Sequence, residues 1–134
     1  MAEEDWQEKY MQFQTLQQQI EQISEHIGML NQQNQELEIS QQAVAEVGKT
    51  AVNQEILAPV ANGIFIKTKL LENQKLIVNV GANTTVERTV EEVVKLLEEH
   101  ANDTTKKIIE AEEILLELQQ QAMKIYEEVE AAQQ

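Results

Sequence analysis

Residues 13–30 read FQTLQQQIEQISEHIGML, and the apolar residues in this stretch recur at steps that alternate between three and four. They are Phe13, Leu16, Ile20, Ile23, Ile27 and Leu30. This spacing places them along one stripe of an α-helix, as in the seam of a coiled coil. The stripe continues outward to Trp6 on one side and to Leu37 and Val44 on the other. The spacing predicts a long N-terminal helix over residues 1–50.

The second half of the chain carries a matching stripe. Its members are Val90, Val94, Leu97, Ile108, Leu115, Leu118, Ile125 and Val129. Thr89 and Glu92 form a capping box that predicts the start of this helix, which we expect over 89–134. If the two helices run antiparallel, one register matches the whole seam, with Leu30 facing Ile108. The alternative is a pair of helices within an ordinary bundle.

The same register predicts how individual layers of the seam are filled. Leu16 faces Ala122, so a large residue meets a small one and the layer fills space without a clash. Asn34 faces Thr104 near the middle, and a buried amide at one seam position is a known device for setting register. We therefore expect Asn34 and Thr104 to form one polar layer.

Residues 51–88 break the heptads and alternate instead as short strands. The predicted strands are 55–60, 63–70, 75–80 and a short fourth through 84–86. The Asn62-Gly63 pair is the strongest short signal for a hairpin turn, and Gly81-Ala82-Asn83 marks a second turn. Pro59 cannot donate to a strand ladder, so we expect it at an edge or a bulge. The chain is therefore predicted as α+β, with two β-hairpins between two long helices.

This central insert cannot cover its own apolar surface. Its second and third strands are apolar on both faces, and it leaves strand edges open, which proteins normally pair, cover or charge. We expect inserts of several chains to join into a shared sheet or barrel, and the alternative is that the insert folds back onto its own helices. The predicted oligomer interface is Ile64, Phe65, Ile66, Leu76, Ile77, Val78 and Val80.

Charge and composition argue against several classes of function. The net charge is −14, with +1 over residues 49–95 and −15 over the rest. Nucleic acids and anionic membranes need clustered Lys and Arg, so neither is an expected partner. The sequence has no Cys, and His26 and His100 fall in different layers, so we expect no catalytic site, no metal site and no cofactor.

The start of the sequence, MAEEDWQEKY, is acidic and lacks the features of a signal peptide. No apolar stretch approaches the length that spans a membrane. We therefore expect a cytoplasmic protein that is not an enzyme.

The central run is the most specific part of the sequence. It reads LAPVANGIFIKTKL at 57–70, KLIVNVG at 75–81 and VERTVEE at 86–92. Together with the order helix, two hairpins, helix, it resembles the alpha class of the prefoldin family over essentially the whole chain. Ala58 stands where Val is more usual in that class.

The resemblance implies an ATP-independent holdase. Two alpha and four beta subunits would join through a double β-barrel platform, and the ends of six coiled coils would capture unfolded client proteins and deliver them to a group II chaperonin. The competing interpretation is a structural coiled-coil adaptor that binds one folded partner. An RNA-binding arm is a further alternative, which the acidity disfavours.

The resemblance places client contact at the coil end that holds both termini. The candidate residues there are Trp6, Tyr10, Met11, Phe13, Leu116, Met123 and Tyr126. Met and aromatic side chains suit varied apolar partners, and Ile109, Leu116 and Met123 recur every seven residues off the seam. The alternative for Trp6, Phe13 and Met123 is that they close the end of the coil, and for the seam residue Phe13 this alternative is favoured.

Overall fold

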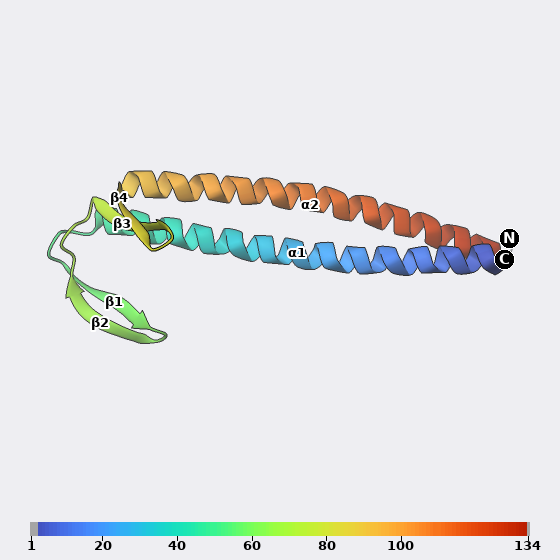
Figure 1. The fold of residues 1–134 in the computed structure, drawn as a ribbon, viewed down its shortest axis with the longest axis horizontal. Coiled ribbons are helices and arrows are strands. Elements are labelled where there is room, and N and C mark those ends of the chain that lie inside the picture. The colour runs from blue at the N-terminus through green and yellow to red at the C-terminus, as the bar shows by residue number, and fades with distance from the viewer. Residues whose placement is uncertain (1–2, 134) are drawn as a thin grey trace. The chain divides into compact units, whose positions relative to one another are not determined.

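A computed structural model describes residues 3–133. The elements follow in the order α1 (Glu3–Lys49), β1 (Glu55–Ala61), β2 (Ile64–Lys69), β3 (Lys75–Gly81), β4 (Thr84–Thr89) and α2 (Val90–Gln133) (Figure 1). The chain divides into two compact units. We call Met1–Asn34 with Asp103–Gln134 the terminal unit, and Gln35–Asn102 the hairpin unit.

In the terminal unit the two helices run antiparallel. Lys9 Nζ lies 2.9 Å from Glu128 Oε2, and the Phe13 and Tyr126 rings pack with centroids 6.1 Å apart. Further along, Asn34 Nδ2 donates to Thr105 Oγ1 at 3.0 Å. As the residue number rises on α1 it falls on α2, and all three pairs lie within one residue of the predicted register. The antiparallel pairing is therefore confirmed.

The predicted seam is where the helices bury their side chains. Every apolar seam residue named above is buried or partly buried, and the residues between them are mostly exposed. Leu16 and Ala122 are both buried, as are Leu30 and Ile108. The predicted register places Ala111 opposite Ile27. Ala111 is 4% exposed, and Ile27 is partly buried. The seam thus fills its layers with large and small residues in turn.

The polar layer differs from the sequence prediction in one respect. Asn34 bonds to Thr105 rather than to Thr104, while Thr104 is buried in the seam. An asparagine amide extends well beyond Cβ, so it reaches the hydroxyl at the flank of the opposing helix while Thr104 fills the layer itself. Asn34 Oδ1 is buried and has no hydrogen-bond partner among the described residues. This layer therefore carries the energetic cost of a half-satisfied amide.

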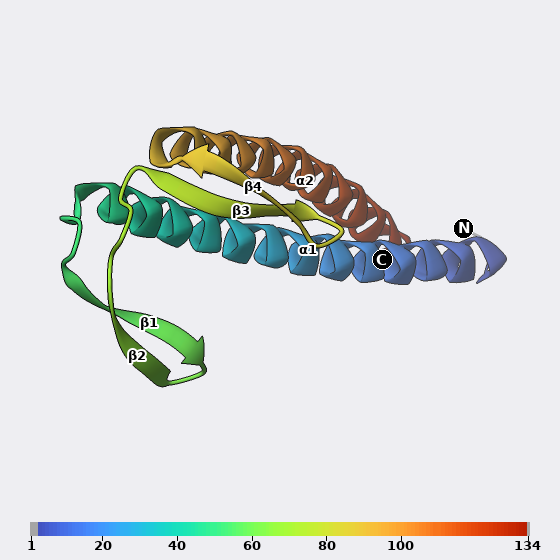
Figure 2. The ribbon, with the colours of Figure 1, turned by 60° about the vertical axis from the view of Figure 1, so that its left-hand side comes forward.

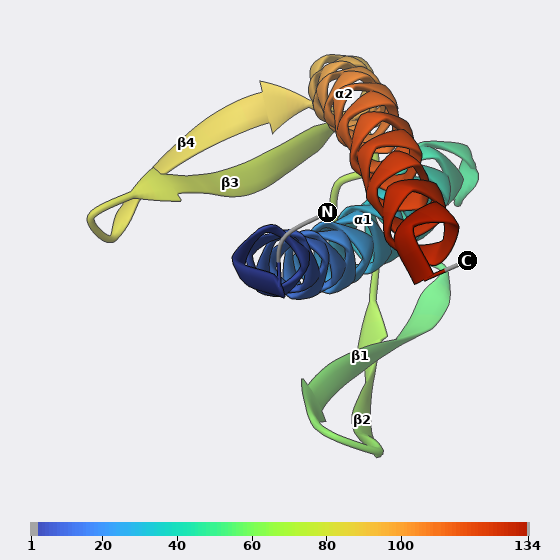
Figure 3. The same cartoon turned by 90° about the vertical axis from the view of Figure 1, so that its right-hand side faces the viewer.

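The hairpin unit contains two separate antiparallel sheets of two strands each, β1–β2 and β3–β4 (Figures 2 and 3). Glu55 pairs with Lys69 in the first sheet, and Lys75 pairs with Thr89 in the second. The four predicted strands are confirmed. The fourth is longer than predicted because its ladder to β3 continues to Thr89, at the helix start.

The φ angles in the two hairpin turns agree with the residues at those positions. Gly63 has a φ of 75°, which is the reason that glycine follows Asn62. In the second turn Ala82 and Asn83 both have positive φ, 50° and 59°, as a type I′ turn requires. The register of β1 shifts between Pro59 and Ala61, in agreement with the expected place of Pro59 at an edge or a bulge.

Residues between the hairpins tie the end of α1 to the start of α2. Asn73 Nδ2 donates to the Thr50 carbonyl at 2.9 Å, and the Val90 N–H donates to the Gln74 carbonyl at 2.9 Å. Thr89 Oγ1 accepts a hydrogen bond from the Glu92 N–H at 3.1 Å, which is the Thr89 half of the predicted capping box, while the Glu92 carboxylate lies 4.0 Å from Arg88 Nε. The hairpins are thereby anchored at the helix ends through backbone groups.

We predict that Asn34→Leu stabilises the helix pair. The substitution removes a buried carbonyl oxygen without a partner and adds apolar volume to the seam, while the exposed Thr105 hydroxyl can bond to water. The gain should be about 1 kcal/mol, measured as a higher melting temperature by circular dichroism at 222 nm. Gln33→Leu makes the same chemical change at an exposed neighbour and should leave the midpoint nearly unchanged. A lower midpoint for Asn34→Leu would contradict this account of the layer.

Candidate functional site

The hairpins present apolar surface that the chain itself does not cover. No residue from 55 to 89 is buried. Of the predicted interface, Leu76 and Val78 are partly buried, whereas Ile77 is 77% exposed. The remaining four members are also exposed: Ile64, Phe65, Ile66 and Val80. The proposal that the insert folds back onto its helices therefore leaves most of this surface unexplained.

The strand registers show which faces are apolar. On β1–β2, Ile66 pairs with Ala58 on one face, and Phe65 pairs with Pro59 on the other, so both faces are apolar. On β3–β4 the apolar side chains gather on one face, where Val78 pairs with Val86. The opposite face has Ile77 beside Glu87 and is otherwise polar. The first hairpin is thus the one that is apolar on both faces.

Two exposed residues of β1 belong to this surface but were not in the predicted set. Leu57 is 62% exposed and Val60 is 58% exposed. Leu57 lies opposite Lys67 and next to the Pro59–Phe65 pair, so it continues the apolar patch along the strand. Residues 56–61 form a continuous apolar run without alternation, so the sequence did not indicate which of them stay exposed.

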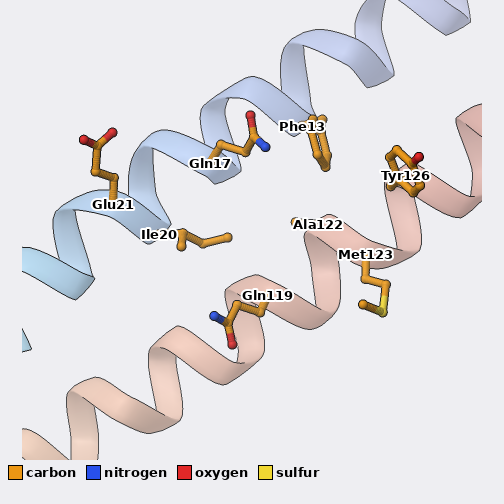
Figure 4. A pocket seen from close by; sticks show the side chains of 8 residues that line it. All are labelled: Phe13, Gln17, Ile20, Glu21, Gln119, Ala122, Met123 and Tyr126. Atoms are coloured by element: carbon orange, nitrogen blue, oxygen red, sulfur yellow. The ribbon is translucent and has the colours of Figure 1, made fainter.

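A groove of about 620 Å3 lies between the helices of the terminal unit (Figure 4). Its lining is Phe13, Gln17, Ile20, Glu21, Gln119, Ala122, Met123 and Tyr126. Phe13 and Ile20 reach into it from α1, and Tyr126 and Met123 border it from α2 (Figure 4). Met123 is 65% exposed, so its flexible thioether side chain is free to meet a partner.

A second groove of about 470 Å3 is lined by Glu8, Met11, Gln12, Thr15, Leu16, Gln121 and Ile125. Residues 17 and 21 flank the α1 seam on one side, and residues 8, 12 and 15 flank it on the other. The helix pair of the terminal unit is therefore hollowed on both sides of its seam. We call the two hollows the terminal grooves.

The structure brings some of the predicted client-binding residues together and separates others. Phe13, Met123 and Tyr126 share the first groove, and Met11 lies in the second. Trp6 and Tyr10 stack on each other with ring centroids 5.6 Å apart.

Leu116 is exposed but lines neither of these two grooves. It lies one heptad before Met123 on α2. Ile20 and Ala122 line the first groove but were predicted only as seam residues, because a helix pattern does not show where a groove flanks the seam.

One ion pair links α1 to α2 near the grooves. Lys9 and Glu128 meet across it at 2.9 Å, and both are partly accessible to solvent. The hydrogen bond from Lys9, with the charge of its ammonium group, lowers the pKa of the Glu128 carboxyl below its ordinary value. Glu128 therefore stays ionised to lower pH than a free glutamate, and the pair adds to helix pairing only above that lowered pKa.

Residues 3–133 hold no group of three or more His, Asp and Glu side chains placed to bind a metal ion. Within the same range, no helix is both long enough and apolar enough to cross a membrane. The features that remain are the apolar hairpins and the terminal grooves, and both present apolar side chains to solvent.

Comparison with known proteins agrees with this architecture. The prefoldin subunit family model matches residues 16–134. A prefoldin subunit alpha from Methanosphaera stadtmanae is 37% identical over 83 residues, which are 62% of this chain and 59% of that protein. The same subunit from Methanoculleus marisnigri is 30% identical over 118 residues, covering 86% of this chain and 76% of the relative.

Among solved structures, a filamentous PFD from Methanocaldococcus jannaschii, determined by cryo-EM, has the same fold. Its TM-score is 0.75 at 23% identity, and the match covers 86% of this chain and 95% of that one. The family match extends over both helices and both hairpins. This chain therefore belongs to the prefoldin family, as an alpha-class subunit of the archaeal type.

Proposed function

We propose that this chaperone-type subunit is part of an ATP-independent holdase of the cytoplasm. Its segments would divide the work, with 51–88 as the oligomerisation insert and 1–50 and 89–134 as the coiled-coil arms. The insert joins beta-class subunits, two alpha with four beta, in a β-barrel platform. The terminal grooves capture non-native proteins, which pass to a group II chaperonin. The observation that carries capture is the pair of apolar grooves bordered by Met and aromatic side chains.

Assembly through the hairpins is supported by their incompleteness. A two-stranded hairpin is at best marginally stable alone in water, and each hairpin here is its own sheet with two open edges. The exposed apolar faces supply the driving force for association, and the edges supply unpaired backbone groups for strand addition. Each alpha subunit offers two such hairpins, so it can contact two neighbours.

We predict that Ile66→Asp dissociates the assembled complex and leaves the helices intact. Ile66 is half exposed in the single chain, so the aspartate stays hydrated there, but it would be buried without a partner in a joined sheet. Sedimentation velocity should show smaller species, and circular dichroism should show nearly the same helix content.

Thr85→Asp is the matched control, because Thr85 is exposed on the polar face of β4 opposite Asn79. This variant should remain assembled. An Ile66→Asp protein that sediments like the wild type would place the interface elsewhere.

Capture at the terminal grooves is supported by their chemistry. Unfolded proteins differ in sequence but share exposed apolar side chains, so a surface that binds many of them needs adaptable contacts. Met11 and Met123 have flexible side chains, and Tyr126 and Phe13 offer flat aromatic surface. An adaptor for one folded partner would instead show selective binding to that partner, which the same assay detects.

We predict that Met123→Ser together with Tyr126→Ser weakens client capture. Losing two large apolar contacts should raise the concentration needed to suppress aggregation roughly a hundredfold, since each buried side chain contributes on the order of 1.5 kcal/mol. Light scattering of a refolding client measures this. Both residues are exposed, so assembly should not change.

Ile39→Ser is the control, because Ile39 is equally exposed but lies in the hairpin unit. Full protection by the double variant would move the capture surface away from the first groove. Deleting residues 1–14 and 122–134 tests the same point more broadly: the complex should stay assembled and protect less well.

A further inference from the structure

We propose that the terminal grooves select client segments that carry lysine or arginine beside large apolar side chains. The inference rests on the proposed capture function and adds a chemical preference to it. An apolar groove alone would accept any exposed apolar segment. The preference comes from the charges of the terminal unit that surround the grooves.

The surface around the grooves is strongly acidic. Residues 3–21 and 117–130 hold nine carboxylates and two lysines, a net charge of −7. The nine are all exposed: Glu3, Glu4, Asp5, Glu8, Glu21, Glu117, Glu127, Glu128 and Glu130. The partial charges of the two helix ends that meet here are opposite in sign and nearly cancel, so the side chains decide the local potential.

The two lysines near the grooves do not offset this potential evenly, because both act on one carboxylate. Lys9 bonds to Glu128 at 2.9 Å, and Lys124 precedes Glu128 by four residues, which places it beside the same carboxylate on the helix surface. The other lysines of the unit, Lys106 and Lys107, lie ten or more residues before the nearest groove residue of α2. The remaining carboxylates therefore keep most of their negative potential.

Each groove also has a carboxylate in its own lining. Glu21 borders the first groove beside Gln17 (Figure 4), and Glu8 borders the second beside Met11. An apolar client side chain in the groove would bring its neighbours in sequence to these rims. A lysine or arginine there gains an ionic partner, and it can also lie over the exposed Tyr126 ring. A glutamate there meets a like charge at short range.

The experiment compares three labelled 16-residue peptides that share the same leucines and phenylalanines and differ only in four flanking residues, which are Lys, Gln or Glu. Fluorescence anisotropy measures their binding to the full-length chain. We expect the order Lys, Gln, Glu, with a Lys-to-Glu affinity ratio of roughly tenfold or more at low salt. At 1 M salt the ratio should fall towards one, because a Debye length near 3 Å screens the exposed carboxylates.

Neutralising the local carboxylates should remove the preference. In the variant Glu8→Gln, Glu21→Gln, Glu127→Gln the Lys-to-Glu ratio should drop at least threefold, by the loss of three of the local charges. The matched control Glu36→Gln, Glu38→Gln, Glu98→Gln changes three exposed carboxylates of the hairpin unit and should keep the wild-type ratio.

The outcomes separate this inference from the function on which it rests. Equal binding of all three peptides, unaffected by salt, would overturn the charge preference and leave groove capture standing. Binding of none of them would overturn groove capture, and the preference with it. An equal drop in the ratio for both triple variants would show that total charge matters and that the rims do not, which also refutes the proposal.

Discussion

The structure depends on one interaction, the antiparallel packing of two heptad seams. Leu16 against Ala122 and Leu30 against Ile108 remove apolar stripes from water that neither helix could bury alone. The chain must therefore return on itself. The hydrogen bonds of Asn73 and Gln74 to the helix ends fix the return at residues 50 and 90. Because the seam consumes the apolar stripe of both helices, it leaves little to cover the hairpins.

The lack of a free apolar helix stripe explains why the apolar faces of the hairpins stay exposed. Their apolar faces have neither a third strand nor a helix stripe to pack against, and no residue from 55 to 89 is buried. In the proposed assembly each chain completes its sheets with strands of another chain. The nearly neutral charge of this region is consistent with association, because joining several copies would otherwise accumulate repulsion. The residues outside 49–95, by contrast, carry a net charge of −15.

In the terminal unit two grooves flank the same seam. Met123 and Tyr126, which lie off the seam, border the first groove, and the Lys9–Glu128 pair links the two helices nearby. An ion pair at the surface contributes little to stability, so the helix ends rely on weak contacts. Adaptable side chains suit the proposed capture of differing partners.

The sequence alone determined the helices, the antiparallel register, the four strands and the turn at Asn62-Gly63, because each depends on a local period or on the φ requirement of single residues. The family resemblance followed from the central run for the same reason. The tertiary structure alone decided that Asn34 bonds to Thr105, that Leu57 and Val60 extend the hairpin surface, and that Ile20 lines a groove. These features depend on how far apart two helices sit and which way a strand faces. Periodicity carries no information on either, since a stripe of apolar residues looks the same whether or not a groove flanks its seam.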